Sequence, residues 1–267
     1  MLIIAERINA SRRRIARAMA ERDAAHIARE VRIQAAAGAH FIDVNAGCDP
    51  EREIGYLKWA VQVVQDNTDL PLCIDCAPAE GFRAALELVR GDDVMLNSVN
   101  GEPARLREVL PIAAERGARL VGLLMDAGGL SGGVDDRMEI ASRIVEAADK
   151  AGIGPGRLYV DPCVQPLGTS PGQVEAVLET VRRVMAQFPG IHTTGGLSNI
   201  SFGLPYRSAL NRAFAALMVQ AGLDSAIIDP TEVDMMASVL AAEALCGKDE
   251  WCANYIAAER KGLLRPH

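Results

Sequence analysis

The amino-acid sequence predicts a (β/α)8 barrel, the TIM-barrel fold, and three observations support this prediction. The chain has 267 residues, close to the roughly 250 residues that are typical of one such barrel. Eight short apolar runs alternate with eight segments of helical periodicity, the order expected of parallel strands joined by right-handed helical crossovers. Almost every apolar run also finishes at, or just before, a small polar or acidic residue.

The apolar runs have the length of strands that are buried in a parallel sheet. They cover residues 2–6, 41–45, 72–75, 94–97, 120–126, 158–161, 191–199 and 226–229. Apolar side chains pack a sheet, whereas a carboxylate or amide at the last position of a strand serves no packing purpose. The strands of such a barrel all finish at one end, where barrel enzymes have their active sites. We therefore expect a site rich in hydrogen-bonding groups at this end.

The segments between the runs have the apolar periodicity of helices that cover a sheet. They are residues 20–37, 51–64, 79–89, 103–116, 137–151, 171–187, 206–221 and 231–245. Gly38, Gly117 and Gly222 follow three of them, where glycine supplies the left-handed residue that ends a helix. A doubly wound open sheet is the alternative, but eight repeats and no Gly-x-Gly-x-x-Gly after the first strand favour the closed barrel. No linker divides the chain, so we expect a single domain over residues 1–267.

Composition excludes several classes of partner. The formal net charge of −7 argues against a nucleic acid, whose phosphates need a basic surface. No run approaches the roughly 20 apolar residues that span a bilayer, and the first run reaches Glu6 too early for a signal peptide. Six scattered cysteines do not suggest a disulfide framework in a chain that can bury its own core. The sequence thus predicts a cytoplasmic protein with no nucleic-acid or membrane partner.

Other motifs indicate packing or loops rather than metal or nucleophilic chemistry. Cys73 and Cys76 have C-x-x-C spacing, but positions three apart in a strand face opposite sides, and no histidine completes a zinc site. We therefore expect no metal. The four histidines form no Ser-His-Asp pattern, which leaves carboxylates as candidate acids near neutral pH. Residues 128–133 are glycine-rich and indicate either a phosphate cradle or, since no Gly-Lys-Ser/Thr follows, a loop at the active-site end.

Four strand ends carry a distinctive set of side chains, namely Asp75, Asn97, Asp161 and Asn199. Two carboxylates and two amides, without a lysine or arginine among them, suit a neutral ligand with several N–H donors, such as an aminopyrimidinone ring. The alternative is that each residue caps the helix that follows it. Arg207, after a short loop, is either a grip for an anionic substrate tail or a solvated first-turn residue.

These residues stand within motifs that resemble a known family. The motifs are residues 5–9 (Ala-Glu-Arg-Ile-Asn), 42–45 (Ile-Asp-Val-Asn), 96–98 (Leu-Asn-Ser), 161–162 (Asp-Pro), 196–201 (Gly-Leu-Ser-Asn-Ile-Ser) and 210–212 (Leu-Asn-Arg), with Asp75 and Arg207. In order and spacing they resemble the pterin-binding methyltransferases, and most closely the methyltetrahydrofolate:corrinoid protein methyltransferases. The folate domain of cobalamin-dependent methionine synthase is similar, more distantly. The resemblance extends from Met1 to about Cys252.

The resemblance implies a dihydropteroate synthase-like pterin-binding barrel with assigned roles. Asp75, Asn97 and Asp161 would hold the pterin ring, and Asn199 would be the catalytic residue that hydrogen-bonds N5. Arg207 would position the pterin or its benzoyl-glutamate tail. The other candidate substrate-binding residues are Gly196, Ser198 and Phe202, followed by Glu6, Asp43, Asn45 and Asp229. Phe202 departs from family members that carry a polar residue there, and it either seats a corrinoid face or closes the pocket.

The same resemblance implies the substrates and partners. Tetrahydrofolate or 5-methyltetrahydrofolate would be bound, and the methyl group would pass between N5 and the cobalt of a corrinoid, in a direction that the sequence leaves open. No histidine has the Asp-x-His-x-x-Gly signature of a cobalamin domain, so the corrinoid is expected on a partner protein. The family also suggests a homodimer.

The expected mechanism depends on protonation of N5, because a neutral amine is a better leaving group than an amide anion. Asn199 does not titrate, but its amide can accept from protonated N5 or donate to the neutral amine, and the proton is expected from solvent through this network. A dihydropteroate synthase-like enzyme is one alternative, but residues 193–196 and 227–230 lack the lysine and the Ser-x-Arg-His which that family expects there. The other alternative is a non-catalytic folate-binding subunit, against which the presence of Asn199 argues.

Overall fold

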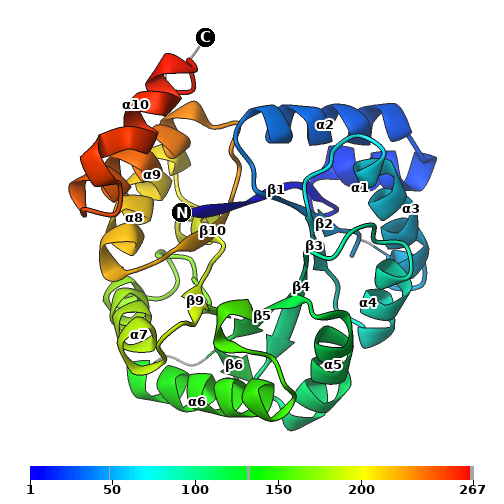
Figure 1. Cartoon of the computed structure of the whole chain (residues 1–267), viewed down its shortest axis with the longest axis horizontal. Coiled ribbons are helices and arrows are strands. Elements are labelled where there is room, and N and C mark those ends of the chain that lie inside the picture. The colour runs from blue at the N-terminus through cyan, green and yellow to red at the C-terminus, as the bar shows by residue number, and fades with distance from the viewer. Residues whose placement is uncertain (48, 131–132, 265–267) are drawn as a thin grey trace.

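Eight parallel strands form the barrel that the sequence predicts (Figure 1). The computed structural model describes residues 1–47, 49–130 and 133–264. Within them the strands follow the order β10-β1-β2-β3-β4-β5-β8-β9. Their bounds are β1 Leu2–Asn9, β2 Phe41–Asn45, β3 Leu72–Asp75, β4 Val94–Asn100, β5 Arg119–Leu123, β8 Leu158–Asp161, β9 His192–Thr193 and β10 Ser225–Ile228. The backbone amide of Ile227 donates to the Gly195 carbonyl at 3.0 Å, which joins the two outer strands and closes the barrel.

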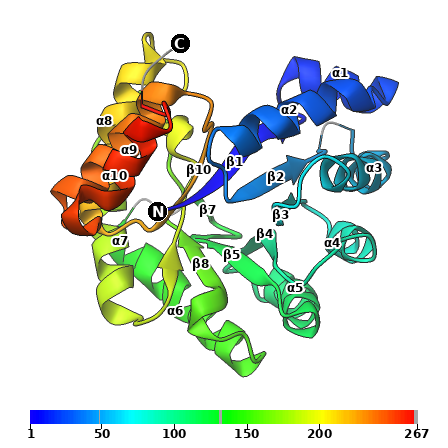
Figure 2. The same cartoon turned by 45° about the horizontal axis from the view of Figure 1, so that its top comes forward.

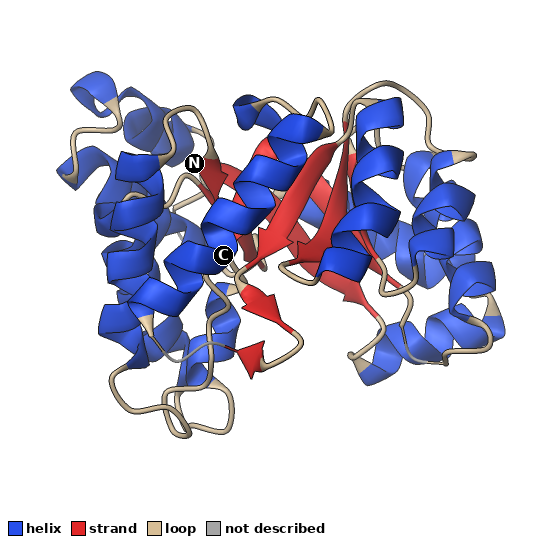
Figure 3. Cartoon of the chain, turned by 90° about the horizontal axis from the view of Figure 1, so that it is seen from below, coloured by secondary structure: helices blue, strands red, loops and turns tan. Residues whose placement is uncertain are grey.

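Helices surround the strands on all sides, as the side view in Figure 3 shows. The helices are α1 Arg13–Glu21, α2 Ala24–Ala36, α3 Glu53–Gln65, α4 Ala79–Leu86, α5 Pro103–Arg116, α6 Val134–Lys150, α7 Gln173–Gln187, α8 Arg207–Ala221, α9 Val233–Leu245 and α10 Ala253–Arg260. A small hairpin, β6 Met125–Asp126 with β7 Gly129–Leu130, follows β5. Figure 2 shows α10 against α9, near the N-terminus of the chain. In the described part of the chain, no helix is long and apolar enough to cross a membrane.

The barrel interior explains why polar strand ends meet. Its apolar layer consists of Ile4, Phe41, Cys73, Met95, Val121 and Tyr159. Alternate residues of a strand face the same side. The residue two positions after each of these apolar residues therefore also faces the interior, and it lies nearer the C-terminal end of the strand. On four strands this next position is Asp43, Asp75, Asn97 and Asp161. A second apolar cluster, which includes Cys76, packs between the barrel and the helices, so Cys73 and Cys76 do lie on opposite faces.

Two predicted elements were wrong in their bounds. The predicted helix 20–37 begins only at Ala24, because Arg22 adopts a left-handed conformation (φ 56°) and the Asp23 side chain caps α2 by accepting from the His26 amide at 3.0 Å. The helix that ends before this turn, α1, was not predicted. The predicted strand 191–199 ends at Thr193, and Asn199 lies in a 3-10 helix, Leu197–Ser201. The two glycines between them pair with β10 through backbone groups only, after which the chain leaves the sheet.

Candidate active site

Three neighbouring strands each bring a polar residue to one level near the C-terminal end of the barrel, which we call the mouth. The prediction that Asn97 ends its strand was wrong, because β4 continues to Asn100. The register pairs Asn45 with Asp75, and Asp75 with Asn97. The Asn45 side-chain amide donates to Asp75 Oδ2 at 2.8 Å. Burial raises the pKa of Asp75 to about 6, the hydrogen bond from Asn45 lowers it, and the negative charge of Glu53 raises it further. Asp75 is therefore held in place by its neighbour and titrates just below neutral pH.

Asp43 lies one step deeper in the barrel than this row. It is 2% exposed, and the side chains of Cys73 and Asn97 form hydrogen bonds with it. Burial, with the charge of Asp75 next, raises the pKa of Asp43 well above its ordinary value. Its Oδ1 atom has no hydrogen-bond partner among the described residues. Asp43 thus forms the floor beneath Asn97 rather than part of the rim.

Asp161 faces the same mouth from the other side of the barrel. The Cys163 amide donates to its Oδ1 atom at 2.7 Å, which is possible because Cys163 adopts a left-handed conformation with φ 61°. Burial raises the pKa of Asp161 to about 6, whereas the Cys163 hydrogen bond and the charge of Arg137 lower it. A Cβ atom at Gly195 would lie 3.6 Å from Asp161 Oδ1, so the carboxylate stands against the end of β9.

The 3-10 helix Leu197–Ser201 carries Asn199, and side-chain hydrogen bonds hold it. Arg207 Nε donates to Ser201 Oγ at 2.9 Å, and Arg207 Nη2 donates to the Ser198 carbonyl at 2.7 Å. A Cβ atom at Gly196 would come within 3.2 Å of the Asn199 Nδ2 atom, closer than most real Cβ contacts. Glycine at position 196 therefore leaves room for the Asn199 amide, and Arg207 fixes the backbone that presents it.

On the β1 side, Glu6 faces this 3-10 helix. The Ser198 hydroxyl lies 3.3 Å from both carboxylate oxygens of Glu6, and Arg12 Nη2 lies 3.5 Å from Glu6 Oε1. Burial raises the pKa of Glu6 to about 7, against the opposing effects of Arg12 and the Ser198 hydrogen bond. Asp229, by contrast, has fixed partners, since it accepts from Arg7 at 2.9 Å and from the Thr231 amide and hydroxyl at 3.0 and 2.6 Å.

Two arginines near the mouth were missed by the sequence analysis. Arg105 Nη2 donates to the carbonyls of Cys76 and Ser98 at 3.3 and 2.9 Å, so it ties the residues that follow Asp75 and Asn97. Arg137, in the first turn of α6, is 1% exposed, and within the part of the chain that the structure describes its Nε and Nη1 atoms lack partners. Neither stands in a motif or at a strand end, so nothing in the spacing marked them.

The rim beside Asn199 is exposed and aromatic. Phe202 is 67% exposed and Tyr206 is 75% exposed. The Arg207 guanidinium carbon lies 6.0 Å from the centroid of the Phe202 ring, within reach of a cation–π contact. The Phe202 ring is therefore largely exposed beside the helix that carries Asn199.

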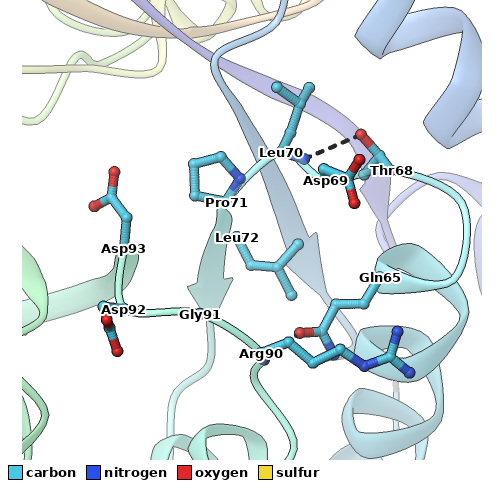
Figure 4. Close-up of a pocket in the computed structure, with 10 residues that line it drawn as sticks. All are labelled: Gln65, Thr68, Asp69, Leu70, Pro71, Leu72, Arg90, Gly91, Asp92 and Asp93. Atoms are coloured by element: carbon cyan, nitrogen blue, oxygen red, sulfur yellow. Dashed lines mark hydrogen bonds between the residues drawn. The ribbon is translucent and has the colours of Figure 1, made fainter.

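A cavity of about 390 Å³ lies elsewhere, and Figure 4 shows its lining. It is formed where β3 and β4 begin, between residues 65–72 and 90–93, and so lies at the opposite end of these strands from Asp75 and Asn97. Three of its four charged residues have partners outside it, since Arg90 pairs with Asp66, Asp92 with Arg116 and Asp93 with Arg119. In the part of the chain that the structure describes, no group of three or more His, Cys, Asp or Glu side chains could hold a metal ion. Of the sequence motifs, Cys48, Ser131 and Gly132 lie outside the described residues.

Comparisons with known proteins agree with this geometry. The chain is 38% identical, over 100% of its own length and 98% of the relative's, to the methylcorrinoid:tetrahydrofolate methyltransferase of Eubacterium limosum. It is 29% identical to the methionine synthase of Mycobacterium leprae (strain TN) over 87% of this chain, but it spans only 20% of that protein. The expected resemblance to both is confirmed.

Solved structures show the same fold. A dihydropteroate synthase from Xanthomonas albilineans, in complex with 7,8-dihydropteroate, superimposes with a TM-score of 0.63 at 21% identity, covering 84% of each chain. The 7,8-dihydropteroate synthase from Vibrio fischeri ES114 gives 0.64 at 16% identity, over 92% of this chain and 93% of that one. The predicted barrel is thereby confirmed. A family model described as pterin binding enzyme matches residues 5–229, and the chain therefore belongs to the pterin-binding enzyme family.

Proposed function

We propose that this protein is a methyltransferase that moves a methyl group between N5 of tetrahydrofolate and the cobalt of a corrinoid carried on a partner protein. The observation that carries the proposal is the identity of 38% over the full chain to a methylcorrinoid:tetrahydrofolate methyltransferase. The name of that relative makes the methylcorrinoid the methyl donor, and we propose the same net direction here. The corrinoid is the second substrate, and it supplies or accepts the methyl group at the mouth.

In this proposal Asp75, Asn97 and Asp161 bind the pterin ring. The ring presents an amino group and adjacent N–H groups, and a carboxylate accepts two such parallel hydrogen bonds well. Asp75 and Asp161 stand on opposite sides of the barrel, with pKa values near 6 that leave them mostly ionised at neutral pH. Asn45 orients the first and the Cys163 amide orients the second. The cradle is thus arranged before the ligand binds.

Asn199 acts at N5 in this proposal. When tetrahydrofolate accepts a methyl group, N5 becomes positively charged as the bond forms, and the Asn199 carbonyl oxygen can accept from the N5–H group. In the reverse direction the same contact stabilises protonated N5, which is what makes the pterin a leaving group. A contact that is stronger in the transition state than in the bound substrate raises turnover rather than affinity. Gly196 and Arg207 set the position of this amide.

The remaining candidates have supporting roles in the proposal. Ser198 joins the Asn199 helix to Glu6. Asp43 orients Asn97 from below. Asp229 holds Arg7 at the junction of β1 and β10. Phe202, exposed at the rim, would face the corrinoid.

A dihydropteroate synthase remains the other enzyme to consider. The structures that resemble the chain at 21% identity or less support the fold alone. Residues 193–196 (Thr-Thr-Gly-Gly) and 227–230 (Ile-Ile-Asp-Pro) lie where that family is expected to carry a lysine and a Ser-x-Arg-His. A non-catalytic folate-binding subunit would keep the cradle but would have no use for the arrangement around Asn199.

The decisive experiment follows the absorption spectrum of cobalt. Purified protein is mixed with tetrahydrofolate and methylcobalamin, and in a second series with methyltetrahydrofolate and cob(I)alamin, each with free cobalamin and with an added corrinoid protein. We expect protein-dependent conversion in both series. Absence of conversion in every mixture, with folate binding intact by calorimetry, would contradict the enzyme and favour the binding subunit. Formation of dihydropteroate from its precursors would favour the synthase.

We also propose that residues 1–267 are one folding unit and that the chain is a cytoplasmic homodimer. All five described cysteines are free, which supports a reducing compartment. A groove of about 380 Å³ between α8 and α9 is lined largely by small and apolar residues, including Ala216, Ala241 and Leu245, and Leu245 is 88% exposed. This surface supports contact with a second copy. Light scattering should give twice the monomer mass, and Leu245→Glu should reduce it toward the monomer.

A further inference from the structure

Glu6 lies next to the helix that presents Asn199. It follows Ala5, the last residue of β1 that pairs with β10. Both of its carboxylate oxygens lie 3.3 Å from the Ser198 hydroxyl, and Ser198 immediately precedes Asn199 in the 3-10 helix. The Glu6 side chain is 19% exposed, so it is largely enclosed yet in contact with the mouth. A carboxyl group is therefore one hydrogen bond away from the neighbour of the residue that we assign to N5.

The mechanism proposed above requires a proton to be added to N5 or removed from it, but it names no group that supplies or accepts that proton. Asn199 does not titrate near neutral pH, and Asp75 and Asp161 are needed as carboxylates for the pterin. Asp43 is enclosed beneath Asn97 and has no exposed route to the mouth. Of Glu6, Asp43, Asp75 and Asp161, only Glu6 forms a side-chain hydrogen bond with the Asn199 helix among the described residues.

We propose, on the basis of the function proposed above, that Glu6 holds and releases the proton exchanged at N5, with the Ser198 hydroxyl as the bridge between them. A hydroxyl suits this position because it donates one hydrogen bond while it accepts another. It can pass a proton in either direction without a change in its own charge. The bridge and Asn199 are consecutive residues of the same 3-10 helix.

The chemical step is balanced in both directions. Toward folate, the N5 lone pair forms the new bond to the methyl carbon, and the electron pair of the methyl–cobalt bond stays on cobalt. N5 then carries an extra positive charge and loses its proton, which the Glu6 carboxylate accepts. In reverse, the Glu6 carboxyl group protonates N5, and the pair of the N5–methyl bond returns to N5 as the methyl group leaves. Glu6 is thus base in one direction and acid in the other.

The charges around Glu6 fit a group that changes protonation in this range. From the elements packed against it they are Arg12 before α1, Asp43 on β2, Asp229 after β10 and Glu232 before α9. Burial is the largest influence on the pKa of Glu6 and raises it to about 7; Arg12 and the Ser198 hydroxyl lower it, and Asp229 and Glu232 raise it. Arg7, the next residue, is engaged with Glu30 and Asp229 instead.

The test is the pH dependence of a single turnover, measured in both directions with free cobalamin. For the wild type, we expect the rate toward folate to rise with pH and level off above about pH 7, and the reverse rate to fall over the same range. Glu6→Gln keeps a hydrogen-bond acceptor for Ser198 but cannot exchange the proton. It should lose the break in the profile and about 100-fold in rate at the favoured pH, with a folate Kd within about threefold of the wild type.

Two further variants keep the proposal open to refutation if Glu6→Gln does not fold. Arg12→Met removes the nearest positive charge from a residue whose side chain is 40% exposed, and it should move the break to higher pH because the carboxylate loses a stabilising neighbour. Ser198→Ala should move it in the same direction and also slow turnover. Arg17→Met is the matched control, since Arg17 is 77% exposed and pairs only with Glu21 among the described ion pairs.

The outcomes separate this inference from the function on which it rests. A wild-type profile that is retained in Glu6→Gln, or a break that stays in place in Arg12→Met, would overturn the role of Glu6 while methyl transfer itself stood. A wild type that transfers no methyl group at any pH would overturn both. Loss of the break in Glu6→Gln together with its shift in Arg12→Met supports the proposal.

Discussion

The two sides of the mouth are built in different ways. On the β3–β4 side, Asp75 and Asn97 are positioned by strand register, by the Asn45 side chain and by the Arg105 bonds to the backbone. On the β9–β1 side, Asn199 lies outside the sheet in a 3-10 helix that is held by Arg207 and faces Glu6. The first side is a rigid cradle that suits binding. The second depends on side-chain hydrogen bonds, and in the function proposed here its Asn199 amide would act at N5.

Asn199→Ala is expected to have the largest effect on turnover, and it tests the difference between the two sides of the mouth most directly. Loss of the amide should reduce turnover by about 100-fold or more, since removing one donor or acceptor of a developing charge costs on that order. Folate affinity should change little, because the cradle is on the other strands. Stopped-flow methyl transfer and calorimetric binding measure the two quantities. An equal loss in both would show that Asn199 only binds the pterin.

Asp161→Asn should have the opposite effect, weakening folate binding more than it slows turnover. It removes charge-assisted hydrogen bonds to the pterin, each contributing about 1.5–3 kcal/mol, so the folate Kd should rise roughly 10- to 100-fold. The rate at saturating folate should fall much less. Calorimetric titration gives the Kd, and Asp93→Asn, at the far end of β4, is the control. An unchanged Kd would remove Asp161 from the pterin site.

Arg207→Met should weaken the Asn199 side selectively. The 3-10 helix would lose its bonds at Ser201 and at the Ser198 carbonyl, and turnover should drop by about tenfold. Arg207→Lys should recover part of the loss, because it can restore one bond only. If folate affinity fell as strongly as turnover, the arginine would instead grip the substrate tail.

Arg105→Met should loosen the cradle side by a smaller amount. Two hydrogen bonds to backbone carbonyls disappear, at about 0.5–1.5 kcal/mol each, and a fraction of this should show as a folate Kd raised by about three- to tenfold. Arg90→Met, on an exposed ion pair at the other end of the barrel, should leave the Kd unchanged. A loss of stability without any change in Kd would contradict a positioning role.

The smallest effect concerns stability and pH. Burial raises the pKa of Asp75 and Asp161 to about 6 in the folded protein, so between the unfolded value and pH 6 the native state holds more protons than the unfolded chain. The contribution of these groups to stability therefore falls as pH rises through this window. Asp75→Asn should raise the free energy of unfolding at pH 8 by about 1 kcal/mol and have less effect at pH 4. Urea denaturation at the two pH values measures it; a gain that is equal at both would contradict the assignment.

The barrel, and the meeting of polar side chains on its β3–β4 side, could be predicted from the residue pattern alone. A polar residue two positions after an interior apolar one must face the same side of its strand, so Asp75, Asn97 and Asp161 converge once eight parallel strands close. That reasoning needs only local periodicity and the count of repeats. The same alternation puts Asp43 and Asn45 on one side of β2, with Asn45 level with Asp75 and Asp43 one step deeper.

The arrangement of the β9–β1 side of the mouth depends on contacts that form only in the folded protein. Asn199 was expected at a strand end but lies in a 3-10 helix, because its neighbours pair with β10, which follows almost thirty residues later. The bonds from Arg105 to two strand ends and from Ser198 to Glu6 join residues that are far apart in the chain. The burial that brings the pKa of Glu6 to about 7 likewise exists only after the barrel closes. The spacing of residues in the sequence does not predict this pKa, because the pKa depends on how far the folded barrel excludes water from the Glu6 carboxyl group.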